Sequence, residues 1–393
     1  MDIPAVPAAR DRLPEIQLVR AIAITGVLCV HATSFATVYM KGSSSYWVYN
    51  LVNIFMKYGT PTFIFLSSFI LFYNYYATPL SREVIGRFYK KRLLYIIVPY
   101  IIFSIIYFTL VHYWYYPDRS LSDTMEDFLT KLATGKAYTH LYFLFINMQF
   151  FLLFPLILLL FKRVPSLVKW ALPAGLLIQW AFIIANHYGL QLPNRMSWAP
   201  SYASHYLLGA VVGIYYPKLK RWLIVCKEHA TPKRIAVWAM LVGVWLAAGV
   251  VNVIVYYHFR LYHVEYHQFL FDALWGIYTL VGTIVLLQLA FLIYRSALAL
   301  IIRPMERLAG LSFGVYLIHP LFLFFYRAYP PSTGTSAIIH LWYVGGFAVA
   351  LFSSWLVVGL AARYMPGAAL LFGQLPKVRK SSVPPPDSSK VAL

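Results

Sequence analysis

Ten stretches of about 20 mostly apolar residues follow one another along the chain, and they constrain its fold more than any other feature. A helix of about 20 residues crosses the hydrocarbon core of a bilayer. A helix also satisfies its own backbone polar groups, which lipid cannot do. We therefore predict an all-α integral membrane protein with about ten transmembrane helices. The expected spans are 16–38, 47–76, 93–116, 140–161, 167–187, 199–217, 235–257, 268–293, 309–328 and 337–362.

The second span is long and contains Gly59-Thr60-Pro61, where we expect a kink or a break. The apolar runs continue through almost the whole chain, which favours one membrane domain over residues 16–364. A short cytoplasmic segment, 1–15, precedes it. The tail, 374–393, is rich in Pro, Ser and Lys, and we expect it to be disordered.

Charge distribution gives the predicted orientation. The chain is 61% hydrophobic, and its 12% of charged residues is about half the usual value for a soluble domain. Most of the 33 Lys and Arg lie in alternate loops, as the positive-inside bias predicts, so we place both termini in the cytoplasm. This pattern argues against nucleic acid as the reason for the net charge of +20. The opposite loops hold only six basic residues: Lys41, Arg119, Lys131, Lys136, Arg195 and Arg260.

Two polar residues in the first span are the strongest candidates for function. Arg20 and His31 are 11 positions apart, so they share one helix face at a separation of about 16 Å along the axis. The arginine is suited to hold phosphate or carboxylate, and the imidazole is suited to act as a general base. The alternative is an ordinary boundary anchor and a polar packing residue.

Other ionisable residues in or near the spans have open roles. His319 is expected at a depth similar to that of His31, where it is either a second acid/base group or a packing residue. His140 is expected at the outer boundary, where it is able to meet an acceptor hydroxyl. We treat Asp272 as a structural polar residue. We find no metal-ligand spacing in the sequence.

Six segments, in order from about Glu15 to Ala361, resemble the acyltransferase-3 family of bacterial integral membrane enzymes. Two positions depart from the family pattern: Ser68 stands where Gly is usual, and Tyr142 where Trp is usual. The segments are Arg20-Ala-Ile-Ala with His31, Gly59–Phe69, Phe88–Leu93 with Pro99-Tyr100, His140–Leu144, Tyr206–Gly209, and Leu311–Pro320.

The resemblance implies an O-acyltransferase of the bacterial plasma membrane. Such an enzyme moves an acyl group, usually acetyl, from cytoplasmic acyl-CoA to a hydroxyl of an exported or cell-surface carbohydrate or glycolipid. His31 and His319 are then the expected catalytic residues, and His140 and Tyr142 the expected contacts to the acceptor. Direct transfer and an acyl-enzyme both remain open. Basic residues expected to bind the coenzyme A phosphates are Arg20, Arg87, Lys91 and Arg92.

Two alternatives accompany this interpretation. The basic residues at 87–92 also fit a role in topology alone. A transporter or exporter of polysaccharide or of a lipid-linked sugar would also have many helices, buried polar residues and broken segments. Corresponding broken helices in the two halves of the sequence would favour the transporter. Only one break, at Gly59–Pro61, is clear, so the enzyme is the preferred interpretation.

Overall fold

The computed structural model describes residues 13–223, 230–296, 298–331 and 336–376, and within these ranges every regular element is a helix. The α-helices are α1 (Pro14–Thr33), α2 (Ala36–Tyr39), α3 (Tyr46–Phe55), α4 (Gly59–Tyr75), α5 (Arg82–Arg92), α6 (Val98–Tyr115), α7 (Leu121–Thr134), α8 (Tyr142–Arg163), α9 (Ala171–Ala185), α10 (Ala203–Leu223), α11 (Pro232–Tyr262), α12 (Gln268–Ser296), α13 (Ala299–Arg327), α14 (Ser336–Tyr364) and α15 (Ala368–Phe372). Short π or 3-10 turns are η1 (Leu93–Ile97), η2 (Pro165–Trp170), η3 (Asn186–Leu190), η4 (Arg195–Ser197) and η5 (Ala199–Tyr202).

The all-α membrane fold is confirmed. In the described part of the chain, nine helical segments are long and apolar enough to cross a bilayer. The remaining predicted span, 199–217, begins with the turn η5 and continues as α10, whose last turns carry Lys218, Lys220 and Arg221. Nearly every residue in the first half of α10 is buried against other helices. A helix surrounded by protein does not need the apolarity of one that faces lipid.

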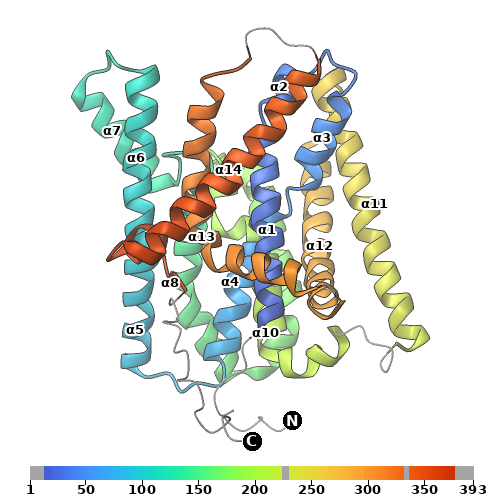
Figure 1. The fold of residues 1–393 in the computed structure, drawn as a ribbon. Helices are drawn as coiled ribbons and strands as arrows, with labels where there is room; N and C mark the ends of the chain where they lie inside the picture. The colour runs from blue at the N-terminus through green and yellow to red at the C-terminus, as the bar shows by residue number, and fades with distance from the viewer. Residues whose placement is uncertain (1–12, 224–229, 297, 332–335, 377–393) are drawn as a thin grey trace, which may run out of the picture.

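Helix α1 lies at the centre of the bundle (Figure 1). It packs against α3, α4, α12, α13 and α14. The predicted break in the second span is confirmed, because α3 ends at Phe55 and α4 begins at Gly59. A Cβ atom on Gly59 would lie 2.6 Å from a methyl carbon of Val27 and 2.8 Å from the carbonyl oxygen of Ala23. The glycine therefore permits the close approach of α4 to α1.

Helices α4 and α10 also pack closely. A Cβ on Gly209 would lie 2.4 Å from the carbonyl oxygen of Phe65, and one on Gly213 would lie 2.6 Å from that of Phe69. Ser68, the departure from the family pattern, is fully buried and donates a hydrogen bond to the carbonyl oxygen of Tyr206 at 2.5 Å. Small residues and such bonds hold membrane helices together where lipid provides no hydrophobic driving force between them.

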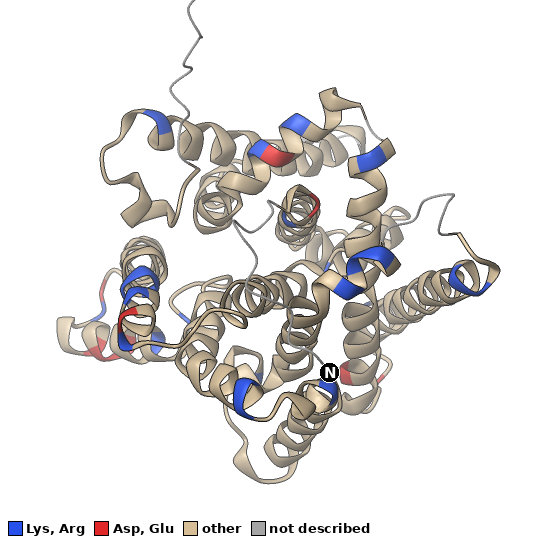
Figure 2. Cartoon of the chain, turned by 90° about the horizontal axis from the view of Figure 1, so that it is seen from below, with Lys and Arg blue, Asp and Glu red and all other residues tan. Residues whose placement is uncertain are grey.

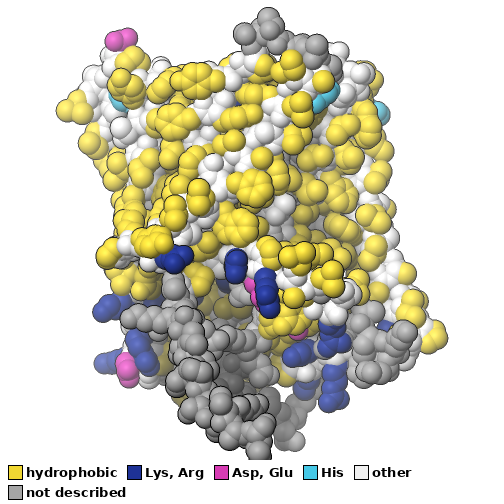
Figure 3. Space-filling model, in the orientation of Figure 1, with side chains coloured by type: hydrophobic (Ala, Val, Ile, Leu, Met, Phe, Trp, Pro, Cys, Tyr) yellow, Lys and Arg dark blue, Asp and Glu magenta, His cyan; other side chains and the backbone are white. Residues whose placement is uncertain are grey.

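Apolar and basic side chains lie on different parts of the molecular surface. Figure 3 shows apolar side chains over most of the face in view and Lys and Arg gathered toward its lower end. Seen from that end, basic residues lie on several helices around the bundle (Figure 2). The positive-inside bias predicts that this end faces the cytoplasm.

One ion pair is buried away from that end. Arg195 on η4 donates to a carboxylate oxygen of Asp272 on α12 at 2.6 Å, and the two side chains are 12% and 10% exposed. The pair links the short turns after α9 to α12. Asp272 thus has the structural partner expected of a costly intramembrane carboxylate.

We predict that Asp272→Ala lowers the free energy of unfolding by about 3–5 kcal/mol, because it leaves the Arg195 charge buried without a partner. The measurement is thermal unfolding of the purified protein in detergent. Asp127→Ala is the control, since Asp127 forms its ion pairs with Arg119 and Lys131 at more exposed positions. An exposed pair is worth about 0–1 kcal/mol. Equal losses of stability in the two variants would contradict the prediction.

Candidate functional site

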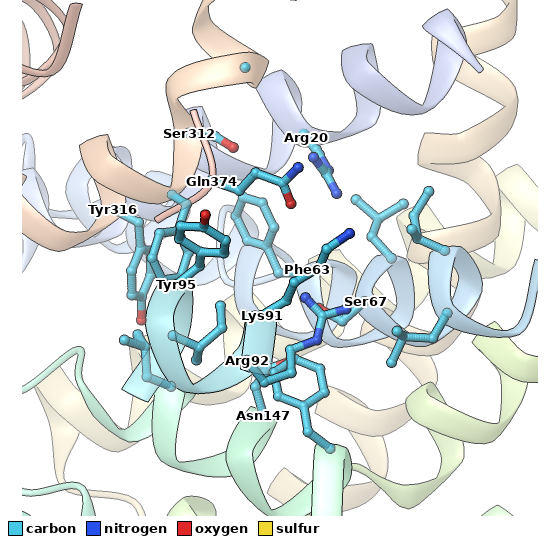
Figure 4. A pocket seen from close by; sticks show the side chains of 18 of the residues that line it. Arg20, Phe63, Ser67, Lys91, Arg92, Tyr95, Asn147, Ser312, Tyr316 and Gln374 are labelled. Atoms are coloured by element: carbon cyan, nitrogen blue, oxygen red, sulfur yellow. The ribbon is translucent and has the colours of Figure 1, made fainter. Parts of the chain in front are cut away.

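A cavity of about 660 Å³ opens between α1, α4, α8, α13 and the junction of α5 with η1. Three cations line it: Arg20, Lys91 and Arg92 (Figure 4). Of the described residues that line it, only Glu306 carries a carboxylate. The volume lies within the range of about 300–1,000 Å³ that is usual for small-molecule sites. The cavity therefore suits an anionic ligand of the size of a nucleotide cofactor.

The two basic residues at the end of α5 are positioned by its junction with η1. Arg92 contacts two aromatic rings, with its guanidinium carbon 5.1 Å from the centroid of Phe88 and 4.7 Å from that of Phe151. Phe88 itself is buried and anchors α5 to the bundle. Stacking of this kind fixes a guanidinium group while its edge stays free for hydrogen bonds. The Nε atom of Arg92 is buried and has no partner among the described residues.

The C-terminal segment forms another wall of the cavity. After α15 the chain turns at Gly373, whose φ of 71° is in the left-handed region that favours glycine. The turn brings Gln374 and Pro376 to the cavity. The amide of Gln374 points toward the guanidinium group of Arg20 in Figure 4. A Cβ on Gly310 would lie 2.7 Å from Pro376, so the small residue on α13 lets this segment approach.

Aromatic rings separate the cavity from the centre of the bundle. Phe63, Phe143 and Tyr316 line the cavity, and their ring centroids are 5.1–6.5 Å apart. Tyr316 also contacts the rings of His140, at 5.3 Å, and His319, at 6.0 Å. Tyr316 is thus shared by the basic cavity and by the histidines beyond it.

Three histidines from distant parts of the sequence meet beyond Tyr316. The ring centroid of His31 is 5.0 Å from that of His319 and 6.4 Å from that of His140, and the last two are 5.6 Å apart. His140 and His319 are fully buried, and His31 is partly buried. Since His31 follows Arg20 by three turns of one unbroken helix, α1 connects the cavity to this histidine cluster.

The hydrogen bonds of His319 identify its tautomer. Pro320 has no N–H, so the carbonyl oxygen of Tyr316 loses the donor that a regular helix would supply. The Nδ1 atom of His319 lies 2.8 Å from this oxygen and 3.2 Å from that of Val315. Carbonyl oxygens only accept, so Nδ1 carries the hydrogen and Nε2 holds a lone pair in the neutral ring. This Nε2 atom is buried and has no partner among the described residues.

The same reasoning applies to His140. Its Nε2 atom lies 3.2 Å from the carbonyl oxygen of Leu317, so Nε2 is the donor and Nδ1 the acceptor. This Nδ1 atom is also buried and, among the described residues, unpartnered. The histidine cluster therefore contains two buried imidazole nitrogens that are able to accept a hydrogen bond or a proton.

Arg327 fixes the end of α1 beside the histidine cluster. It donates to the carbonyl oxygen of His31, and to the hydroxyl of Ser34 at 3.1 Å. Its guanidinium carbon lies 3.8 Å from the ring centroid of Phe35. A cation at the last carbonyls of a helix is favourable, and here it holds the backbone that carries His31.

The structure places most of the residues predicted from sequence in two groups. Arg20, Lys91 and Arg92 share the cavity, and His31, His140 and His319 share the histidine cluster. His140 is fully buried, whereas the sequence suggested the outer boundary. Tyr142, the first residue of α8, donates to the Thr60 hydroxyl at 3.4 Å. Arg87 does not line the cavity; it is exposed and pairs with Glu83 at 3.5 Å, one turn away on α5.

Several residues of the site were not predicted from sequence. Tyr316 is the most informative, because it precedes His319 by one helical turn and so faces the same way. That spacing was a usable signal. Gln374 and Pro376 gave no such signal, since only the packing of α15 brings them to the cavity. In the described ranges, no group of three or more His, Cys, Asp and Glu is arranged to hold a metal ion.

These features define a multi-pass membrane protein with a cation-lined cavity and, beyond Tyr316, a buried histidine cluster. The chain belongs to the acyltransferase-3 family, whose acyltransferase domain matches residues 13–359. It is a protein of a bacterial membrane. No solved structure matches it.

Curated relatives come from Staphylococcus aureus. The chain is 25% identical over 333 residues to a probable poly-β-1,6-N-acetyl-D-glucosamine export protein of strain MRSA252, and equally to that of strain Mu50. The identity is 24% for the protein of the same name from strain MSSA476. Each match covers 79% of this chain and 82% of the relative.

We predict that His319→Asn keeps the stability of the wild type to within about 1 kcal/mol, whereas His319→Ala loses about 1–3 kcal/mol. The asparagine amide N–H is placed to donate to the carbonyl oxygen of Tyr316, as the imidazole does. The alanine leaves that oxygen without its donor. Thermal unfolding in detergent compares the two variants, and equal stability would contradict the assigned hydrogen bond.

Proposed function

We propose that the protein is an O-acyltransferase that moves an acyl group from cytoplasmic acyl-CoA to a carbohydrate hydroxyl. The observation that carries the proposal is the arrangement along α1: Arg20 lines a cation-rich cavity, and His31 stands three turns further on beside two other imidazoles. Family membership supports the same reaction class. An acetyl group is the preferred donor group, and succinyl is the variant to compare.

The cavity supports the donor half of the proposal. Coenzyme A carries several phosphate groups, which planar guanidinium groups bind through paired hydrogen bonds. We assign these phosphates to Arg20, Lys91 and Arg92, and assign no contact to Arg87, which lies outside the cavity. The slender arm that carries the thioester would pass Tyr316 and bring the acyl group to the histidines.

The histidine cluster supports the chemical step. A neutral imidazole, for which we favour His31, accepts the proton of the acceptor hydroxyl as its oxygen attacks the thioester carbon. A carbon–oxygen bond forms, the carbon–sulfur bond breaks, and the imidazolium returns the proton to the departing thiolate. The free Nε2 of His319 is suited to accept a hydrogen bond from the second N–H of that imidazolium.

Export is the second candidate, because the relatives are named as polysaccharide export proteins. A polymer path would have to pass the centre of the bundle, which is occupied by Tyr316 and three imidazoles. An exporter also has no use for a cation-rich site at the predicted cytoplasmic end. These two observations favour acyl transfer.

The test uses the purified protein in lipid nanodiscs with radiolabelled acetyl-CoA or succinyl-CoA and an oligosaccharide of β-1,6-linked N-acetylglucosamine. We expect label in the oligosaccharide. His31→Ala should lower kcat by about 10²–10⁴-fold, the usual contribution of a general base. Arg20→Ala should raise the KM for the acyl-CoA by about tenfold, the loss of roughly one charged contact.

Arg163→Ala is the matched control for Arg20→Ala. Arg163 is an exposed arginine at the end of α8 and does not line the cavity, so its loss should leave both constants unchanged. Undiminished transfer by His31→Ala would refute the assigned base. An unlabelled oligosaccharide with both donors, together with its passage across proteoliposomes, would favour export.

A further inference from the structure

A side chain from another helix bonds to the backbone of α13 beside His319. In a regular α-helix the N–H of Leu321 would donate to the carbonyl oxygen of Leu317, four residues earlier. Here the hydroxyl of Tyr107, from α6, bonds to both of these groups. It donates to the Leu317 oxygen at 2.8 Å and accepts from the Leu321 N–H at 3.1 Å. Tyr107 is fully buried, and its ring stacks on Tyr138 at 4.4 Å.

Every hydrogen in this network has only one possible position. The Leu321 N–H only donates, so the Tyr107 oxygen accepts there and sends its own hydrogen to Leu317. The Leu317 oxygen has two lone pairs, and the second one accepts from Nε2 of His140 at 3.2 Å. The tautomer of His140 therefore depends on a carbonyl group that also accepts the hydrogen of the Tyr107 hydroxyl.

We propose that Tyr107 is a positioning residue for the acyl transfer. It orients the Leu317 carbonyl oxygen toward Nε2 of His140, which keeps the hydrogen on Nε2 and leaves Nδ1 able to accept a hydrogen bond or a proton. The Tyr107 ring also contacts the His140 ring directly: their centroids are 5.1 Å apart and the ring planes meet at 84°. Pro320 performs the corresponding task for His319, by freeing the carbonyl oxygen of Tyr316. Pro320 and the Tyr107 hydroxyl, acting on one helix, thus set the tautomers of two histidines.

Removal of the hydroxyl should undo the arrangement. In Tyr107→Phe the Leu321 N–H loses its acceptor, and the Leu317 oxygen is the acceptor that a regular helix provides. When that bond closes, the carbonyl turns along the helix axis and away from His140. The Nε2–H of His140 then has no fixed partner, and the ring is free to adopt either tautomer.

The control is Tyr100→Phe. Tyr100 lies two turns earlier on α6, is also buried, and donates its hydroxyl to the backbone carbonyl oxygen of Leu132. It thus loses the same kind of bond, at a distance from the histidine cluster. A general loss of packing would affect the two variants alike.

The first measurement is magic-angle-spinning NMR of protein with ¹⁵N- and ¹³C-labelled histidine in lipid bilayers, with the His140 signal assigned by comparison with His140→Gln. We expect the Nε2–H tautomer of His140 in the wild type and in Tyr100→Phe, and a mixture of tautomers in Tyr107→Phe. A wild-type His140 with its hydrogen on Nδ1 would overturn the proposal, and so would a Tyr107→Phe spectrum with no change at His140.

The second measurement rests on the proposed function. We expect Tyr107→Phe to lower kcat for acyl transfer by about 10–100-fold with an unchanged KM for acyl-CoA. In the His140→Gln background the same substitution should cause little further loss, because it acts through His140. Equal losses in the two backgrounds would overturn the role of His140. If the wild type transfers no acyl group, the function fails, while the NMR result still decides the position of the hydrogen.

Discussion

Polar groups inside a bilayer need partners within the protein, and this constraint organises the centre of the molecule. It is most visible in α13. Pro320 removes one N–H from the helix, the Tyr107 hydroxyl bonds to the backbone at Leu317, and two imidazoles donate to the carbonyl oxygens of Tyr316 and Leu317. Each of these neutral imidazoles donates its single N–H to a backbone carbonyl oxygen. The lone pairs that remain are a direct consequence of satisfying the backbone.

The two halves of the site depend on one helix. An unbroken α1 carries Arg20 and His31 on one face, and its burial among other helices prevents rotation or tilting without loss of many contacts. Gly59 permits α4 to lie directly against it, and Arg327 binds the carbonyl oxygen at its end. The distance between the cation-lined cavity and the imidazole of His31 is therefore fixed by helix geometry rather than by a flexible loop.

The sequence predicted what local periodicity and composition control. Apolar runs gave the helices, and the spacing of Arg20 and His31 placed both on one face, as the structure has them. The sequence could not show that His140 and His319 meet His31, because those contacts cross more than 100 residues of chain and depend on how helices pack. Arg87 illustrates the reverse case. It belongs to the same basic run as Lys91 and Arg92, yet only those two line the cavity, and Arg92 is held there by the rings of Phe88 and Phe151.

The charge of the cavity gives its own argument about function. Three cations, with Glu306 as the one carboxylate of the described lining, share a cavity whose other lining residues are both apolar and polar. Like charges in such surroundings repel and lose hydration, so they destabilise the empty protein. An anion that enters recovers this cost as binding free energy, and that energy is available to order a flexible ligand. An acyl carrier with phosphates at one end and a thioester at the other suits such a site, because binding at the cations presents the reactive end to the histidines three turns away along α1.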